Sequence, residues 1–212
     1  YRGDLFYQKK RLQGKWYTDT YHGRHISLNG YKYSQIFTNK QMFSISFPLK
    51  NKSEAGNALK TFISNYGVPE YLTFDGSKEQ CQPGTVFMKQ IKKHSIKFHT
   101  IESEYHNQNA AEGVIREVRR RWFRLKILTN IPNRLWDYGL QWVCDLMQRT
   151  VNSRFDTKNR TPYEIVLGDT PDISEYMDFA FYSYIWFKEQ AGLGDRILAR
   201  FLGVSHKIGN SM

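Results

Sequence analysis

Apolar and polar residues alternate partially over three segments in the N-terminal quarter of the chain. The segments are rich in Tyr, Phe, Ile and Thr, and they read "KWYTDTYHG" (15–23), "YKYSQIFTN" (31–39) and "QMFSISFPL" (41–49). A period of two with these residue types is typical of β-strands. Short polar turns at 27–30 and 38–41 separate the segments. The pattern therefore predicts three consecutive antiparallel strands.

The period then changes to that of a helix. Apolar residues with helical spacing follow residue 50, namely Ala55, Ala58, Leu59, Phe62 and Ile63. Asn51 with Glu54 resembles a capping box at the start of this helix, and Gly67 with Pro69 indicates its end. We expect a helix between these two signals.

The next segments alternate between strand and helix. "EYLTFD" predicts a buried strand that ends at Asp75, and a short helix is expected around "TVFMKQIKKH". A strand at 96–101 and a helix that begins in "HNQNAAEGVIREVRRRW" (106–122) follow. Three strands followed by alternating helices and strands predict a mixed sheet with helices on its faces, which is the ribonuclease H-like order. In this order the first and fourth strands are neighbours.

The helix after 106 has two different faces. At about 100° per residue, one arc collects Val114, Ile115, Val118, Trp122 and Leu125, which predicts a core face. Glu112 lies on the other side with Arg116, Arg119 and Arg120. The simplest interpretation is a solvated face whose N-terminal acid complements the helix dipole. Aromatic stripes at helical spacing are more often core than base-stacking platforms, so Trp122, Trp136 and Trp142 are assigned to the core.

The C-terminal third predicts two more helices and a small β unit. Residues 133–155 have the apolar density of a long helix, and Thr161, Pro162 and Glu164 form a capping-box pattern for the next helix. The tail segments 179–190 and 197–212 look like strands. We expect a basic lead-in segment at 1–14, a ribonuclease H-like catalytic core at 15–170, and a connector with an incomplete β unit at 171–212.

Charge narrows the class of partner. The 212 residues carry a formal net charge of +11, which favours a polyanion, nucleic acid before an anionic membrane. No apolar run approaches the roughly 18 residues of a membrane span, and no secretory signal pattern is present. Cys81 and Cys144 lack a C-x-x-C spacing, and His22 with His25 has no second ligand pair, so neither a disulfide framework nor a zinc site is expected.

Three acids lie where this order of elements concentrates chemistry. Asp19 is in the middle of the first strand, Asp75 ends the fourth, and Glu112 opens the following helix. A charged acid inside a core strand is costly unless it is paired or bound to a cation. Three oxygen ligands with open coordination positions suit Mg²⁺ or Mn²⁺, and two such ions can promote phosphodiester displacement. The spacing of the three acids is by itself weak evidence for such a metal site, and the order of strands and helices strengthens that evidence.

Long pieces of the chain resemble one enzyme family. They are "WYTDT", "IFTNK", "YGVPEYLTFDGSKEQ", "FMKQIKKHSIKFHTIESEYHNQNAAE", "RLWDYGL", "TPYEIVLGDTPDISEYMDF" and "RFLGVSHKIG". With 55 residues between the two aspartates and 36 between Asp75 and Glu112, the chain is similar to retroviral-type integrase catalytic cores, most closely those of copia-type retrotransposons. The resemblance implies that Asp19, Asp75 and Glu112 bind a pair of Mg²⁺ or Mn²⁺ ions. It also implies 3′-end processing of cDNA and strand transfer into target DNA.

The resemblance also suggests DNA contacts and shows departures from the family. Arg116, Arg119 and Arg120 are the expected phosphate contacts, with Lys78 and Asn107 as candidates from loops. Asn109 stands where many integrases have Gly, Gly76-Ser77 replaces the common Asn-Gly, and no His₂Cys₂ segment is present. Glu104 is the alternative third acid if Glu112 is not the ligand.

Two other functions stay open at this point. One is a non-catalytic or domesticated nucleic-acid-binding remnant of an integrase, and the other is a ribonuclease H-like nuclease or transposase. The intact acidic triad favours an enzyme, and the C-terminal blocks favour an integrase. The expected partners are cDNA ends, target DNA and further copies of the chain, without a membrane or a small-molecule substrate. The resemblance implies a cytoplasmic particle and then the nucleus, and a start at Tyr1 suggests a piece of a longer protein.

Overall fold

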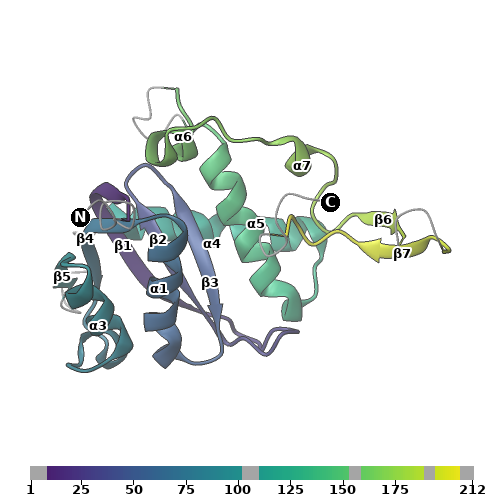
Figure 1. The fold of residues 1–212 in the computed structure, drawn as a ribbon. Coiled ribbons are helices and arrows are strands. Elements are labelled where there is room, and N and C mark those ends of the chain that lie inside the picture. Colours follow the sequence, from purple (N-terminus) through teal and green to yellow (C-terminus); the bar gives the residue numbers. More distant parts are fainter. Residues whose placement is uncertain (1–8, 102–109, 153–158, 189–193, 206–212) are drawn as a thin grey trace.

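A five-stranded mixed sheet lies at the centre of the computed structural model (Figure 1). The structure describes residues 9–101, 110–152, 159–188 and 194–205, and within these ranges it leaves out the side chains of Lys78, Glu79, Ala110, Ala111 and Glu112. The strands of the sheet are β1 (Arg11–His22), β2 (Tyr33–Asn39), β3 (Ser44–Leu49), β4 (Val68–Asp75) and β5 (Lys97–Ile101). Their spatial order is β3-β2-β1-β4-β5.

The pairing of the strands confirms the predicted topology. β1, β2 and β3 form an antiparallel meander, and β4 and β5 run parallel to β1. β4 lies directly beside β1, as the element order predicts. The arrangement is the mixed ribonuclease H-like sheet, and it brings the carboxyl ends of β1 and β4 to the same edge.

Helices cover both faces of the sheet. The helices of the described residues are α1 (Ala55–Asn65), α2 (Lys78–Cys81), α3 (Val86–Lys93), α4 (Ala110–Thr129), α5 (Trp136–Arg149), α6 (Pro162–Leu167) and α7 (Ser174–Met177), and α1, α3, α4 and α5 contribute most of the packing against the sheet. One hydrophobic core includes Phe37 and the apolar faces of α1 and α3, and a second includes Ile36 and the apolar faces of α4 and α5. Neighbouring residues of β2 therefore point into different cores, because successive side chains of a strand alternate between faces.

The core face predicted for α4 is confirmed. Val114, Val118 and Trp122 are buried in one core, against which the half-buried Leu125 packs, and Ile115 is buried beside Tyr17. Trp136 and Trp142 are also buried. The capping box at the start of α6 is present as predicted. Both cysteines are free, and among the described residues no helix is long and apolar enough to cross a membrane.

Two expected boundaries differ from the structure. β1 begins at Arg11 rather than Lys15, because its register against β4 shifts between Leu12 and Lys15. Gly14 lies in this shift with φ of 80°, a conformation that glycine adopts without steric cost, so the strand continues past a break in the alternation. The helix expected over 133–155 ends at Arg149, where Thr150 adopts an extended backbone.

The capping box expected at Asn51 is absent. The Asn51 side chain makes no capping hydrogen bond, and a 3₁₀ turn (Lys52–Glu54) precedes α1. The Glu54 carboxylate instead accepts a hydrogen bond from the backbone N–H of Lys50, at 2.9 Å. In the turn between β3 and α1, the backbone N–H that Glu54 binds therefore belongs to Lys50 and not to Asn51, the residue that the pattern predicts.

A small antiparallel hairpin lies outside the main sheet. β6 (Tyr184–Phe187) pairs with β7 (Ile197–Arg200), and Figure 1 shows this hairpin projecting away from the core beyond α5. The large apolar side chains Trp186 and Leu198 are exposed on it. Whether residues 171–212 form a separate unit stays a prediction.

Candidate active site

Two of the three predicted acids lie side by side. Thr18 of β1 is paired with Phe74 of β4 in a parallel register, so the next residues along the two strands are Asp19 and Asp75. Both line one small cavity of about 100 Å³ at the carboxyl end of the strands. The walls of this acidic cavity are completed by Thr20, Lys52, Ser77 and Gln80. Carboxyl ends of adjacent parallel strands are a common location for sites in α/β sheets.

Asp19 has well-defined partners. Its Oδ1 accepts a hydrogen bond from the backbone N–H of Thr20 at 2.7 Å, and its Oδ2 accepts one from the Arg119 guanidinium at 3.2 Å. Burial raises the pKa of Asp19, Arg119 and the Thr20 N–H lower it, and the nearby Asp75 raises it. The cavity thus disfavours a second negative charge unless a cation compensates it.

Gln80 supplies a further oxygen to this cavity. Its side chain is 2% exposed, and its Oε1 has no hydrogen-bond partner in the described part of the chain. A buried polar atom without a partner is costly, so it points to a ligand that completes it. Carboxylate and amide oxygens are ligands that Mg²⁺ and Mn²⁺ favour, so Asp19, Asp75 and Gln80 fit such an ion.

The third predicted acid is placed only by its backbone. Glu112 lies in the first turn of α4, and its side chain is outside the described residues. Within the described part of the chain, no three His, Cys, Asp or Glu side chains form a metal-binding group. Lys78 opens α2 immediately after the cavity residue Ser77, but its side chain is also outside the described residues, as is all of Asn107.

The three predicted arginines are exposed on α4, and Arg119 and Arg120 each contact a carboxylate. Arg119 forms the ion pair with Asp19. Arg120 donates two hydrogen bonds to Glu117, at 2.7 and 2.6 Å. Arg121 donates to the same carboxylate at 2.8 Å. The hydrogen bonds from Arg120 and Arg121 lower the pKa of Glu117 to about 2, so these ion pairs persist at neutral pH.

Sequence reasoning missed several residues of the acidic cavity. Gln80 belongs to the four-residue helix α2, for which no hydrophobic period was visible. Lys52 lies in the 3₁₀ turn before α1, between the two residues Asn51 and Glu54 of the predicted capping box. Both reach the cavity through the folding of loops around the sheet edge, and no local pattern in the chain indicates this.

The fold has close counterparts among solved structures. No known protein-family profile matches the chain, and no curated protein sequence matches it. The catalytic core domain of BIV integrase superposes with a TM-score of 0.56 at 15% identity, covering 73% of this chain and 93% of that one. The catalytic core domain of HTLV-2 integrase, solved in complex with magnesium in a trimeric form, gives 0.54 at 16% identity, covering 73% and 97%.

A larger assembly also matches. The simian T-cell lymphotropic virus intasome, in complex with the PP2A regulatory subunit B56 gamma, gives a TM-score of 0.58 at 15% identity. That alignment covers 91% of this chain and 71% of the other. Identities this low establish the fold and not the activity. The protein has the ribonuclease H-like fold of retroviral integrase catalytic cores, a five-stranded mixed sheet flanked by helices.

Proposed function

We propose that the protein is a metal-dependent DNA integrase that processes the 3′ ends of retrotransposon cDNA and joins them to target DNA. The observation that carries this proposal is the position of Asp19 and Asp75, side by side in one cavity at the carboxyl end of β1 and β4. The fold supports it, because the similar structures are integrase catalytic cores. The copia-type assignment rests on the sequence resemblance alone.

The residues of the cavity suit this chemistry. Asp19, Asp75 and Glu112 would hold Mg²⁺ or Mn²⁺, and one solved neighbour contains magnesium. When bound, a pair of such ions supplies activation of water or a 3′-hydroxyl and stabilisation of the leaving oxygen. Arg119 contacts the Asp19 carboxylate and neutralises part of its charge. If a metal took over this neutralisation, the Arg119 guanidinium would be left for a DNA phosphate.

The partners belong to the same proposal. DNA ends and target DNA are favoured by the net charge of +11. A multimer is suggested by the trimeric form and the intasome among the neighbours. A cytoplasmic particle followed by the nucleus is the location that the sequence resemblance implies.

One observation favours the alternative, a non-catalytic nucleic-acid-binding remnant. The Arg119 guanidinium forms an ion pair with the Asp19 carboxylate at 3.2 Å, and this contact would compete with a metal for the same carboxylate. This contact is more than one-third exposed on both sides, so it contributes roughly 0–1 kcal/mol. A metal ion bound by several carboxylates would displace such a weak ion pair. We therefore favour the enzyme over the non-catalytic remnant.

The test is disintegration of a labelled branched DNA with Mg²⁺ or Mn²⁺. We expect activity in the wild type and a loss of roughly a thousandfold or more in Asp19→Asn, Asp75→Asn and Glu112→Gln, because several kcal/mol of charge stabilisation is lost. The exposed Asp169→Asn is the control for the loss of one charge. Glu104→Gln separates the two candidates for the third acid, and it should remain active.

The same variants distinguish an enzyme from a binding module. If all variants bind DNA and only the wild type, Asp169→Asn and Glu104→Gln are active, the acidic triad is established. An inert wild type that binds DNA with a steep salt dependence would favour the non-catalytic remnant.

A further inference from the structure

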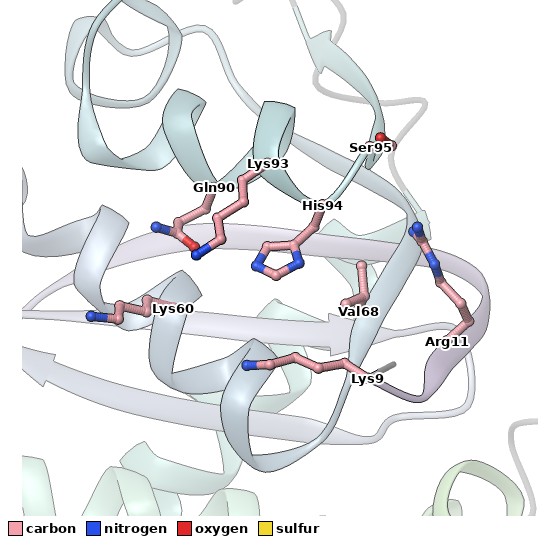
Figure 2. Close-up of a pocket in the computed structure, with 8 residues that line it drawn as sticks. All are labelled: Lys9, Arg11, Lys60, Val68, Gln90, Lys93, His94 and Ser95. Atoms are coloured by element: carbon pink, nitrogen blue, oxygen red, sulfur yellow. The ribbon is translucent and has the colours of Figure 1, made fainter. Parts of the chain in front are cut away.

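A second hollow lies at the other end of the same two strands. It has a volume of about 590 Å³ and is lined by Lys9 and Arg11 near the start of β1, and by Val68 at the start of β4. Lys60 of α1 and the C-terminal end of α3 complete it (Figure 2). Asp19 and Asp75 lie seven or eight residues further along β1 and β4, so roughly 25 Å separates this basic hollow from the acidic cavity at about 3.3 Å per residue.

The side chains around the basic hollow carry one sign of charge. Lys9, Arg11, Lys60 and Lys93 are all exposed, and no Asp or Glu is among the residues that line the hollow. In the described part of the chain none of these four cations forms an ion pair. Arg119, Arg120 and Arg121 of α4 differ, because each of them contacts a carboxylate. The basic hollow therefore gathers four cations without a carboxylate partner in the described part of the chain, away from α4.

The pKa of His94 reflects the positive electrostatic potential inside the hollow. Its ring lies among the basic side chains in Figure 2, with Gln90 and Lys93 on the α3 side and Lys9 opposite. Burial lowers the pKa of His94, and the charges of Lys9, Lys93 and Arg11 lower it further. Gathering cations in this way costs free energy that a bound anion would recover.

The shape of the hollow indicates the kind of anion. Small-molecule sites enclose most of their ligand and are mainly apolar. Here the cations stand exposed on the rim and come from the start of β1, from α1 and from the end of α3. A rim of separated, solvated cations fits an extended polyanion that stays partly hydrated and contacts several charges at once.

We infer that the basic hollow binds the phosphate backbone of duplex DNA, away from the site of chemistry. The inference agrees with the proposed function, but it concerns binding and does not rest on catalysis. At 3.4 Å per base step, 25 Å corresponds to about seven base pairs. The hollow would thus hold DNA that lies well outside the segment at Asp19 and Asp75.

The test compares two pairs of lysine substitutions with the same change of charge. Lys60→Gln with Lys93→Gln removes two cations of the basic hollow, and Lys89→Gln with Lys92→Gln removes two exposed cations of α3 that do not line it. Binding of a 20-base-pair duplex is measured by fluorescence anisotropy over a range of salt concentrations, without metal. We expect the hollow pair to bind about tenfold more weakly at 0.1 M salt and its salt slope to fall by about two, since each phosphate contact contributes roughly 0.9.

The control pair should change affinity by about twofold or less. Equal losses from both pairs, no loss from the hollow pair, or no binding of the duplex by the wild type would each overturn the inference. Because all four lysines are exposed, circular dichroism should show that every variant is folded.

Two further readouts keep this inference separate from the proposed function. Asp75→Asn should bind the duplex as the wild type does even where disintegration is lost, so failure of the catalytic proposal leaves this result unaffected. By NMR, saturating duplex should raise the pKa of His94, because phosphate offsets the charges of Lys9, Arg11 and Lys93. A His94 titration that DNA leaves unchanged would contradict the inference.

Discussion

Burial makes the ionised Asp19 side chain costly to the folded protein. Its carboxylate sits beside a second acid in a small cavity, and Arg119 and the Thr20 N–H compensate only part of the charge. Residues that bind metal are often arranged in this way, because the cation supplies the missing compensation. Asp19 is therefore expected to favour activity at the expense of stability.

Asp19→Asn should stabilise the metal-free protein at pH 7. The pKa of Asp19 is raised above its ordinary 3.8, so the folded state holds the proton more tightly than the unfolded state. The cost of ionisation is absent below pH 3.8 and fully present above the folded pKa. We expect a gain of about 0.5–1 kcal/mol at pH 7, kept small by solvent screening and by the lost contact with Arg119.

The measurement is urea unfolding of Asp19→Asn and wild type between pH 3.5 and 7. The difference between them should shrink as the pH falls. A stabilisation that grows toward acid pH would show that the sign of the argument is wrong.

At the scale of elements, α4 combines a core face with a partly neutralised basic face. Val114, Val118 and Trp122 anchor the helix against the sheet. On the exposed side, Glu117 binds both Arg120 and Arg121. The row of arginines in the sequence is therefore less available to DNA than its charge suggests.

Glu117→Gln should tighten DNA binding. It releases Arg120 and Arg121 and raises the net charge by one, so we expect about three- to tenfold higher affinity at 0.1 M salt and a steeper salt dependence. The helix should lose roughly 0.3–1 kcal/mol from the two ion pairs. Because the pKa of Glu117 is lowered to about 2, that stabilisation is present above its ordinary 4.5 and disappears as the pH falls through about 2.

Glu175→Gln on α7 is the matched control, since it removes one exposed glutamate that belongs neither to α4 nor to the basic hollow. Both variants are compared with the wild type by anisotropy on the same duplex. Equal effects of the two substitutions would mean that net charge, and not release of the arginines, determines the change.

At the scale of the whole molecule, the sheet joins two parts of the chain into one acidic cavity. Asp19 and Asp75 approach each other only when β1 pairs with β4, so the proposed metal would bind both acids only in the folded state. Mg²⁺ or Mn²⁺ should therefore raise the thermal midpoint of the wild type. At a tenfold excess over the dissociation constant we expect about 1.4 kcal/mol, or roughly 3–5 °C.

Asp75→Asn should abolish this shift. Gln80→Met tests the buried amide separately. It removes the Oε1 that has no hydrogen-bond partner among the described residues, so the metal-free midpoint should rise while the metal-induced shift should decrease. A full metal shift in Gln80→Met would exclude Gln80 as a ligand. Differential scanning calorimetry with and without a chelator measures all three proteins.

Local patterns in the sequence determined most of the fold and part of the site. Alternation predicted the β1–β3 meander, helical spacing predicted the core face of α4, and element order predicted that β4 pairs with β1. That pairing also predicts that Asp19 lies beside Asp75. These features depend on periods of two and 3.6 residues, which a chain displays directly.

Contacts between elements were decided only by the tertiary structure. Gln80 and Lys52 reach the acidic cavity, Arg119 binds Asp19 across 100 residues, and Lys9, Lys60 and Lys93 converge on one hollow. The distances between these residues depend on strand register, helix packing and the paths of loops. None of these produces a periodic pattern in the local sequence. The net charge predicts a polyanion as partner, but only the folded chain shows which cations contact carboxylates and which line the basic hollow.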